Sequence, residues 1–138
     1  MLKFLKQNAH LLKHIRRGVE KESLRITPCG SLKQDAHPKA LGSALTHPHY
    51  TTDFSENLLE MVTAPHEGFD ALNTELTQLH AYFYSESNNQ WLWPLSMPMQ
   101  VDDVSDIQIA QYGSSNGGKM KMVYREGLTH RYGKMMQI

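Results

Sequence analysis

The segment from Thr51 to Pro65, TTDFSENLLEMVTAP, combines apolar side chains that need a core with carboxylates that need water or a cation. Its apolar residues are dense enough for a strand, and the pattern is strongest from Asn57 to Thr63. A buried carboxylate is strongly destabilising unless it is paired or bound to a cation. The segment therefore predicts a strand with one face on a core and carboxylates that meet either solvent or positive charge. These carboxylates belong to Asp53, Glu56 and Glu60.

The alternation of side chains along a strand decides which of these acids share a face. In a regular strand Glu56 and Glu60 lie on the same face, because alternate residues point the same way. Asp53 points to the opposite face unless the chain bends just before the strand, near Thr52. With such a bend, Asp53 and Glu60 can reach one ion. A half-solvated edge strand is the alternative.

A second acidic strand is predicted from Gly18 to Thr27, GVEKESLRIT, before the turn residues Pro28 and Gly30. Glu20 and Glu22 share one face of this strand and lie about 7 Å apart. Two carboxylates at this spacing repel each other, whereas a hard cation such as Mg²⁺, which takes oxygen ligands, makes the arrangement favourable. Neutralisation by neighbouring Lys and Arg side chains is the alternative.

The remaining elements do not alternate regularly between strand and helix, which favours an α+β fold with a mainly antiparallel sheet over a doubly wound one. A core-facing stripe at helical spacing predicts a helix between Phe69 and Phe83. Its apolar members are Phe69, Leu72, Leu76, Leu79 and Phe83. We also expect a docked amphipathic helix at the N-terminus, a short helix at 39–45, an extended segment at 91–99, a short strand at 107–112 and a helix at 119–131.

The bulk composition describes one domain with a core and excludes several classes of partner. The 138 residues are 40% hydrophobic and 20% charged, with a net charge of zero. This charge balance gives no general attraction to nucleic acid or to an anionic membrane, and no apolar run approaches the roughly 20 residues of a membrane span. The single cysteine, Cys29, excludes an internal disulfide and suits the cytoplasm.

The glycine-rich stretch GSSNGGK, from Gly113 to Lys119, fits the spacing G-x-x-x-x-G-K. The next residue of a nucleotide-binding P-loop is Ser or Thr, whose hydroxyl binds Mg²⁺, but here it is Met120. A P-loop is therefore excluded. Two alternatives remain, a phosphate contact through backbone N–H groups at a helix start and a plain turn.

Two histidine pairs have the spacing of zinc ligands, His10 with His14 and His47 with His49. No cysteine or acidic residue beside the first pair completes a site. We expect neither pair to bind zinc.

Several segments, in this order, closely resemble the N-terminal part of the proteobacterial glutamate–cysteine ligases, also called γ-glutamylcysteine synthetases. They are IRRGVEKESLRI, HPKALGSALTHPHYTTDFSENLLEMVT, WPLSMP, IQIAQYGSSNGGK and MVYREGLTHRYGKMMQ. The resemblance runs from about Ile15 to Ile138. Members of this family are much longer, so we expect residues 1–138 to be the N-terminal part of a single catalytic domain, truncated at its C-terminal end.

The resemblance implies an enzyme of glutathione biosynthesis that uses ATP to join the γ-carboxylate of L-glutamate to L-cysteine. It implies a fold similar to the catalytic domain of glutamine synthetase, with a curved, mainly antiparallel sheet flanked by helices. Further metal and substrate ligands of the family lie beyond Ile138, so this chain needs the remainder of the polypeptide and should not catalyse alone. The alternatives are a related ligase that uses another amine and a non-catalytic module that binds a metal or a thiol.

The resemblance also assigns roles to individual residues. It implies that Mg²⁺, or Mn²⁺, is bound by Glu20, Asp53 and Glu60, with Glu22 as a less certain neighbour in the same motif. It places the side chain of the cysteine substrate against Phe54, Tyr124 and Leu128. By charge and position, we assign Arg125 to a substrate carboxylate or phosphate and Lys119 to the nucleotide.

Overall fold

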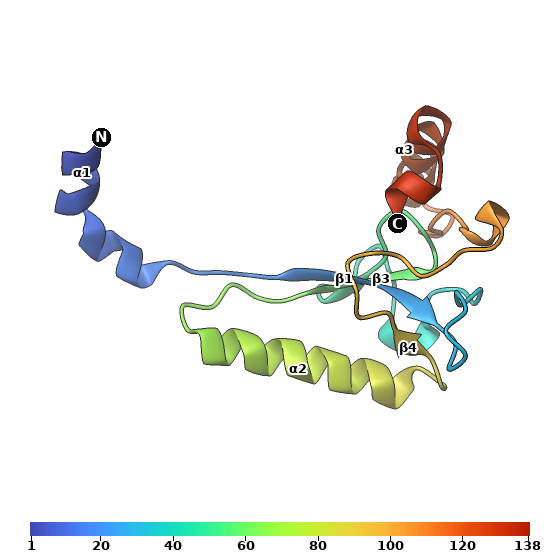
Figure 1. Cartoon of the computed structure of the whole chain (residues 1–138), viewed down its shortest axis with the longest axis horizontal. Helices are drawn as coiled ribbons and strands as arrows, with labels where there is room; N and C mark the ends of the chain where they lie inside the picture. The colour runs from blue at the N-terminus through green and yellow to red at the C-terminus, as the bar shows by residue number, and fades with distance from the viewer.

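The computed structural model describes all 138 residues and has an α+β architecture, as predicted (Figure 1). Every strand pair in the sheet is antiparallel, and the strand order is β2-β3-β1-β4. The strands are β1 (Glu20–Ile26), β2 (Tyr50–Thr51), β3 (Leu58–Val62) and β4 (Trp91–Leu92). The α-helices are α1 (Leu2–Gln7), α2 (Phe69–Glu86) and α3 (Asn116–Tyr132), with short 3₁₀ turns at Ala9–His14, Lys39–Leu41, Val104–Asp106 and Met135–Gln137. None of the helices is both long enough and apolar enough to cross a membrane.

The pairing of β1 with β3 decides which side chains share a face of the sheet. Glu22 pairs with Glu60 and Leu24 pairs with Leu58. Because side chains alternate along each strand, these pairs lie on one face, together with Glu20. One end of this face is acidic and the other end is apolar.

The opposite face of the sheet carries the main core. Leu59 and Met61 of β3, which are 0% and 1% exposed, belong to a buried cluster with Leu79 and Phe83 of α2. Figure 1 shows α2 lying beneath the sheet and α3 above it. The predicted helical stripe is confirmed at Leu72, Leu79 and Phe83, which are buried.

The predicted stripe is wrong at its first residue, because Phe69 is 76% exposed at the N-terminal end of α2. The short helix expected at 39–45 is a single 3₁₀ turn over Lys39–Leu41. Gly42, which follows it, has a φ of +78°, a backbone conformation that ends a helix.

The strand expected at 107–112 is also not formed. Its pairing with the chain before β3 is one antiparallel bridge, Ile109 with Ser55, closed by the backbone hydrogen bonds Ala110 N–H to Phe54 O and Glu56 N–H to Gln108 O. Side chains take two further N–H groups on either side of this bridge: Glu56 accepts from the N–H of Gln111, and Asn57 accepts from the N–H of Gln108. The segment is therefore held by both backbone and side-chain oxygens, and its pairing stops after one bridge without extending the sheet.

The N-terminal helix is not docked as expected. Residues of α1 and of the 3₁₀ turn after it are all unburied, and Figure 1 shows them as an arm that extends away from the sheet. Its apolar side chains are between 53% and 70% exposed, and they are Leu2, Phe4, Leu5, Leu11 and Leu12. The amphipathic pattern is present, but no element of this chain faces its apolar side.

Candidate functional site: an acidic face on the sheet

The candidate site is built on a pair of like charges that face each other across two strands. Glu22 of β1 is the direct partner of Glu60 of β3 in the register. Side chains in such a pair have Cβ atoms about 5 Å apart, and like charges at this distance destabilise a sheet. Glu20 lies two positions along β1 on the same face, so it adds a third negative charge.

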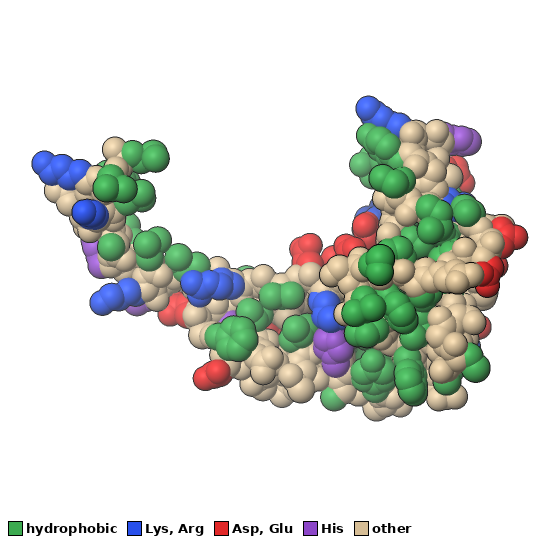
Figure 2. Space-filling view, in the orientation of Figure 1, with side chains coloured by type: hydrophobic (Ala, Val, Ile, Leu, Met, Phe, Trp, Pro, Cys, Tyr) green, Lys and Arg blue, Asp and Glu red, His purple; other side chains and the backbone are tan.

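Asp53 joins this face because the chain bends between β2 and β3. Thr51, the last residue of β2, pairs with Glu60, and Asp53 lies two residues after Thr51. The charge of Asp53 acts on both Glu22 and Glu60. Figure 2 shows acidic side chains gathered on the hollow side of the molecule, between the N-terminal arm and α3.

Partial burial and the crowded negative charge of this face raise the pKa of two of its carboxyl groups. Partial burial, followed by the charges of Glu22, Asp53 and Glu20, raises the pKa of Glu60 to about 7. Partial burial and the charges of Asp53 and Glu20 also raise the pKa of Glu22 above its usual value. Near neutral pH Glu60 is therefore divided between its protonated and ionised forms, and added positive charge favours the ionised form.

Two cations of α3 lie close to this face. Arg125 forms an ion pair with Asp53, with 2.8 Å between its Nη2 and Oδ1 of the carboxylate. Lys121 stands one turn before Arg125, and its charge acts on Glu60. Its Nζ lies 4.6 Å from the ring centroid of Tyr112. The sequence predicted Arg125 as a cation of the site but missed Lys121 and Tyr112, which become neighbours of the acids only through the packing of α3.

The acidic face fits part of a magnesium site. Its donors are carboxylate oxygens, the ligands that Mg²⁺ prefers, and they come from two rigid strands and an adjoining bend. No three acidic, histidine or cysteine side chains of the chain lie close enough together to enclose a metal ion. The four carboxylates therefore fit as one wall of a site that would need further ligands or a closer approach of these side chains.

Glu56 does not belong to this face, although strict alternation from Glu60 placed it there. It is 3% exposed and precedes β3 in a turn. Its carboxylate accepts hydrogen bonds from the backbone N–H groups of His37 at 2.8 Å and Gln111 at 2.7 Å. Glu56 is thus a structural carboxylate that joins two loops.

The residues assigned to the cysteine pocket lie in different environments. Phe54 is 2% exposed and presents almost no surface to a ligand in this chain, whereas Tyr124 on α3 is 65% exposed. Leu128, one turn after Tyr124, is half-buried. Tyr124 and Leu128 share a helical face, as predicted, but Phe54 belongs to the packed interior.

The glycine-rich stretch forms the start of α3. Ser115 caps the helix by accepting from the N–H of Gly118 at 3.1 Å. A Cβ atom at Gly118 would lie 2.5 Å from the carbonyl oxygen of Tyr112, so only glycine permits this close approach. Lys119 is exposed in the first turn of α3, where a phosphate could reach it.

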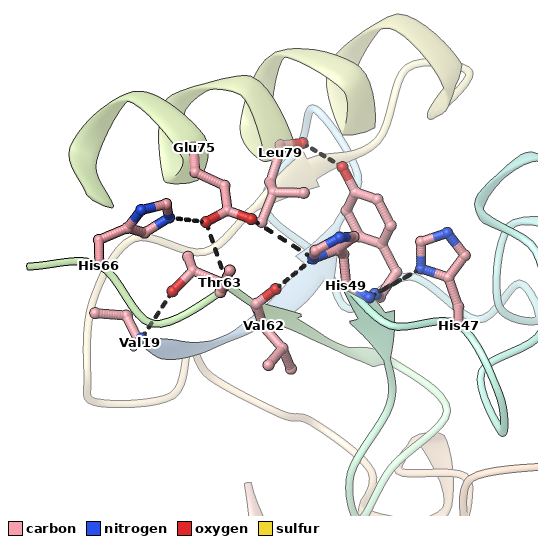
Figure 3. Close-up of polar contacts among 10 residues, drawn as sticks. Val19, His47, His49, Val62, Thr63, His66, Glu75 and Leu79 are labelled. Atoms are coloured by element: carbon pink, nitrogen blue, oxygen red, sulfur yellow. Dashed lines mark hydrogen bonds and ion pairs between the residues drawn. The ribbon is translucent and has the colours of Figure 1, made fainter. Parts of the chain in front are cut away.

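A second cluster of titratable groups lies on the opposite face, between β3 and α2 (Figure 3). Glu75 of α2 lies 2.5 Å from Nε2 of His66 and 3.8 Å from Nδ1 of His49. Nδ1 of His47 accepts from the backbone N–H groups of His49 and Tyr50. His49 and His66 thus connect the loop before β2 and the segment after β3 to Glu75 of the helix.

Comparison with known proteins identifies the family. The model of the glutamate-cysteine ligase family matches residues 2–138. The chain belongs to this family. It is 53% identical to the glutamate–cysteine ligase of Alcanivorax borkumensis over 99% of the chain, and 57% identical to that of Shewanella amazonensis over 90%.

Two solved structures have a fold similar to that of this chain. The chain resembles the crystal structure of the Francisella tularensis glutamate–cysteine ligase in complex with AMP, with a TM-score of 0.86 and 47% identity over 90% of the chain. It also resembles a bifunctional glutathione synthetase from Pasteurella multocida, with a TM-score of 0.80 and 30% identity over 96% of the chain.

The chain spans between 17% and 28% of the length of these relatives. It covers 28% of the Alcanivorax protein, 24% of the Shewanella protein, and 25% and 17% of the two solved chains.

Proposed function

We propose that this chain supplies the acidic wall of the active site of an ATP-dependent glutamate–cysteine ligase. In the proposed reaction, the γ-carboxylate of L-glutamate takes the terminal phosphate of ATP, and the amine of L-cysteine then displaces that phosphate to give γ-glutamylcysteine. This is the first step of glutathione biosynthesis. Membership of the family supports the reaction class, and the AMP complex of the Francisella relative supports the use of ATP.

The observation that carries the proposal is the direct pairing of two carboxylates, Glu22 and Glu60, in the centre of the sheet. A fold that places like charges opposite each other loses stability unless a cation compensates them. Magnesium, or manganese, bound by Glu20, Asp53 and Glu60 would neutralise the negative charge that builds up when a phosphate meets a carboxylate. Glu22 would neighbour the same ions.

The chain's own residues would provide rigid ligands and one side of the substrate pocket. The strands β1 and β3 are fixed by the core beneath them, so their carboxylates keep a defined spacing. Tyr124 and Leu128 would contact the side chain of the cysteine substrate, with Phe54 supporting them from the interior. Lys119, exposed at the start of α3, would contact a phosphate of the nucleotide.

We further propose that residues 1–138 are the N-terminal part of one catalytic domain and act with the remainder of a polypeptide of the relatives' length. The exposed apolar side chains of the N-terminal arm and of α3 would then pack against that remainder. Since the remaining ligands would come from there, the 138-residue chain should be inactive alone. The single exposed thiol of Cys29 is consistent with our placement of the enzyme in the cytoplasm.

The test is release of ADP by the complete gene product that contains this chain, with ATP, Mg²⁺ and L-glutamate. We expect ADP release to require L-cysteine, and Glu60→Ala to lower kcat by at least about a thousandfold, because a ligand to the catalytic ion is lost. Glu86→Ala is the matched control, since Glu86 is exposed on α2 and remote from the acidic face.

Other outcomes would assign the protein differently. ADP release with 2-aminobutyrate or glycine but not with cysteine would indicate a ligase for another amine. No amine-dependent ADP release at all would contradict a ligase and favour a binding module. Normal turnover of Glu60→Ala would contradict the role of the acidic face.

A further inference from the structure

We propose that Arg125 and Tyr112 are positioning residues that together fix Asp53 beside the Glu22–Glu60 pair. This inference rests on the proposed function, because it concerns the orientation of one proposed metal ligand. It replaces the substrate-binding role that the charge of Arg125 first indicated. The contacts of Arg125 and Tyr112 converge on the same backbone carbonyl and carry the argument.

Arg125 contacts Asp53 at two points. Its Nε donates to the backbone carbonyl oxygen of Asp53, and its Nη2 donates to Oδ1 of the carboxylate at 2.8 Å. The two contacts fix both the backbone and the side chain of Asp53. They leave Oδ2 without a hydrogen bond from the protein, so this oxygen is free to bind a cation.

Tyr112 contacts the bend at Thr52 and Asp53 through its hydroxyl and contacts the guanidinium group of Arg125 through its ring. Its hydroxyl lies 2.6 Å from the carbonyl oxygen of Thr52 and 2.9 Å from that of Asp53, and it donates its proton to this pair of acceptors. Its ring is buried, and its centroid lies 4.9 Å from Cζ of Arg125. Tyr112 thus supports Arg125 and shares one of its acceptors.

The backbone segments that carry Tyr112 and Arg125 are in close contact with each other. Gly118 of α3 packs directly against the carbonyl oxygen of Tyr112, an approach that a larger residue would prevent. The start of α3 is therefore fixed relative to Tyr112. Arg125, further along the same helix, reaches Asp53 across a sequence separation of 72 residues.

The burial of Arg125 favours positioning over substrate binding. The residue is 8% exposed, and its Nε and Nη2 are both used by Asp53. Its remaining hydrogen bond is a long one, 3.4 Å from Nη1 to the carbonyl oxygen of Lys121. Residues that orient a metal-binding carboxylate commonly change metal affinity by about ten- to a hundredfold when they are removed.

The test is a titration of the complete gene product with Mn²⁺ alone, followed by electron paramagnetic resonance of the free ion. We expect Arg125→Met to weaken Mn²⁺ binding by about ten- to a hundredfold and Tyr112→Phe to weaken it by a smaller factor. Arg131→Met is the matched control, because Arg131 lies on the same helix and stacks on Tyr132 at 5.1 Å, away from Asp53. It should bind Mn²⁺ as the wild type does.

A double variant separates positioning from a direct or a general structural effect. If Arg125 acts through Asp53, adding Arg125→Met to Asp53→Asn should cause no further loss of Mn²⁺ affinity. Should Arg125→Met prove unfolded by circular dichroism, Tyr112→Phe, which removes only a hydroxyl, carries the same comparison in the Asp53→Asn background.

Different results would contradict the positioning role of Arg125 and the metal role of the acidic face. Unchanged Mn²⁺ affinity in Arg125→Met, with a raised KM for glutamate or ATP, would overturn positioning and make Arg125 a substrate ligand. Additive losses in the double variant would overturn it as well. Absence of Mn²⁺ binding by the wild type would overturn both this inference and the metal role of the proposed function, whereas cysteine-dependent ADP release would still support the reaction class.

Discussion

Glu56 and Glu60 are four residues apart in the sequence, yet their carboxylates lie in opposite environments. The carboxylate of Glu56 is buried and satisfied by two backbone N–H groups, so its charge is stabilised inside the protein. Glu60 receives no such donors and faces Glu22 instead. A carboxylate kept without donors beside another carboxylate is the pattern of a site built for an external cation.

His37 provides a prediction at the scale of one residue. Both of its ring nitrogens are buried without a hydrogen-bond partner. Burial, followed by the charge of Arg25, lowers the pKa of His37 to about 4. Glu56 opposes this effect and His47 adds to it. The folded protein therefore keeps His37 neutral, whereas the unfolded chain protonates it near pH 6.5.

The sign of the pH effect follows from this difference. Because the folded pKa is depressed, the stabilisation is fully present above pH 6.5 and is lost as the pH falls toward 4. We expect acidification from pH 7 to pH 5 to lower the free energy of unfolding by about 1 to 2 kcal/mol through this group. His37→Asn should reduce that pH dependence in urea unfolding measured at both pH values. An unchanged slope would contradict a neutral His37.

At the scale of elements, the sequence predicted those elements whose pattern is local. Alternating residues predicted β1 and β3, and the apolar stripe predicted α2, because each pattern describes a face that packs on one core. The segment at 107–112 was predicted wrongly because the side chains of Glu56 and Asn57, distant in sequence, take the N–H groups of Gln111 and Gln108, and the backbone pairing stops at one bridge. The contact of Arg125 with Asp53 could not be predicted from spacing for the same reason, although the charge of Arg125 marked it as a candidate.

The packing of α2 under the sheet gives a prediction with an internal control. Phe83 is 0% exposed within the main core, whereas Phe69, on the same helix, is 76% exposed. We expect Phe83→Ala to lower the free energy of unfolding by about 3 to 5 kcal/mol, since it removes a buried ring and leaves a cavity. Phe69→Ala should change it by less than about 0.5 kcal/mol. Similar losses for both variants in urea unfolding would contradict this placement of α2.

At the scale of the whole molecule, the acidic face lies on the hollow side, with the N-terminal arm at one end and α3 at the other (Figure 2). The main core lies on the far side of the sheet, so the strands that carry the acids are supported from behind and open in front. The chain covers about a quarter of its relatives. This openness is what the proposed remainder of the polypeptide would close.

The location of a bound divalent ion tests the central claim most directly. It can be measured by anomalous X-ray scattering from crystals of the complete gene product grown with Mn²⁺ and a non-hydrolysable ATP analogue. We predict a manganese peak about 2.0 to 2.3 Å from carboxylate oxygens of Glu20, Asp53 and Glu60. A manganese ion bound elsewhere, with Glu22 and Glu60 facing each other and no ion beside them, would contradict the account.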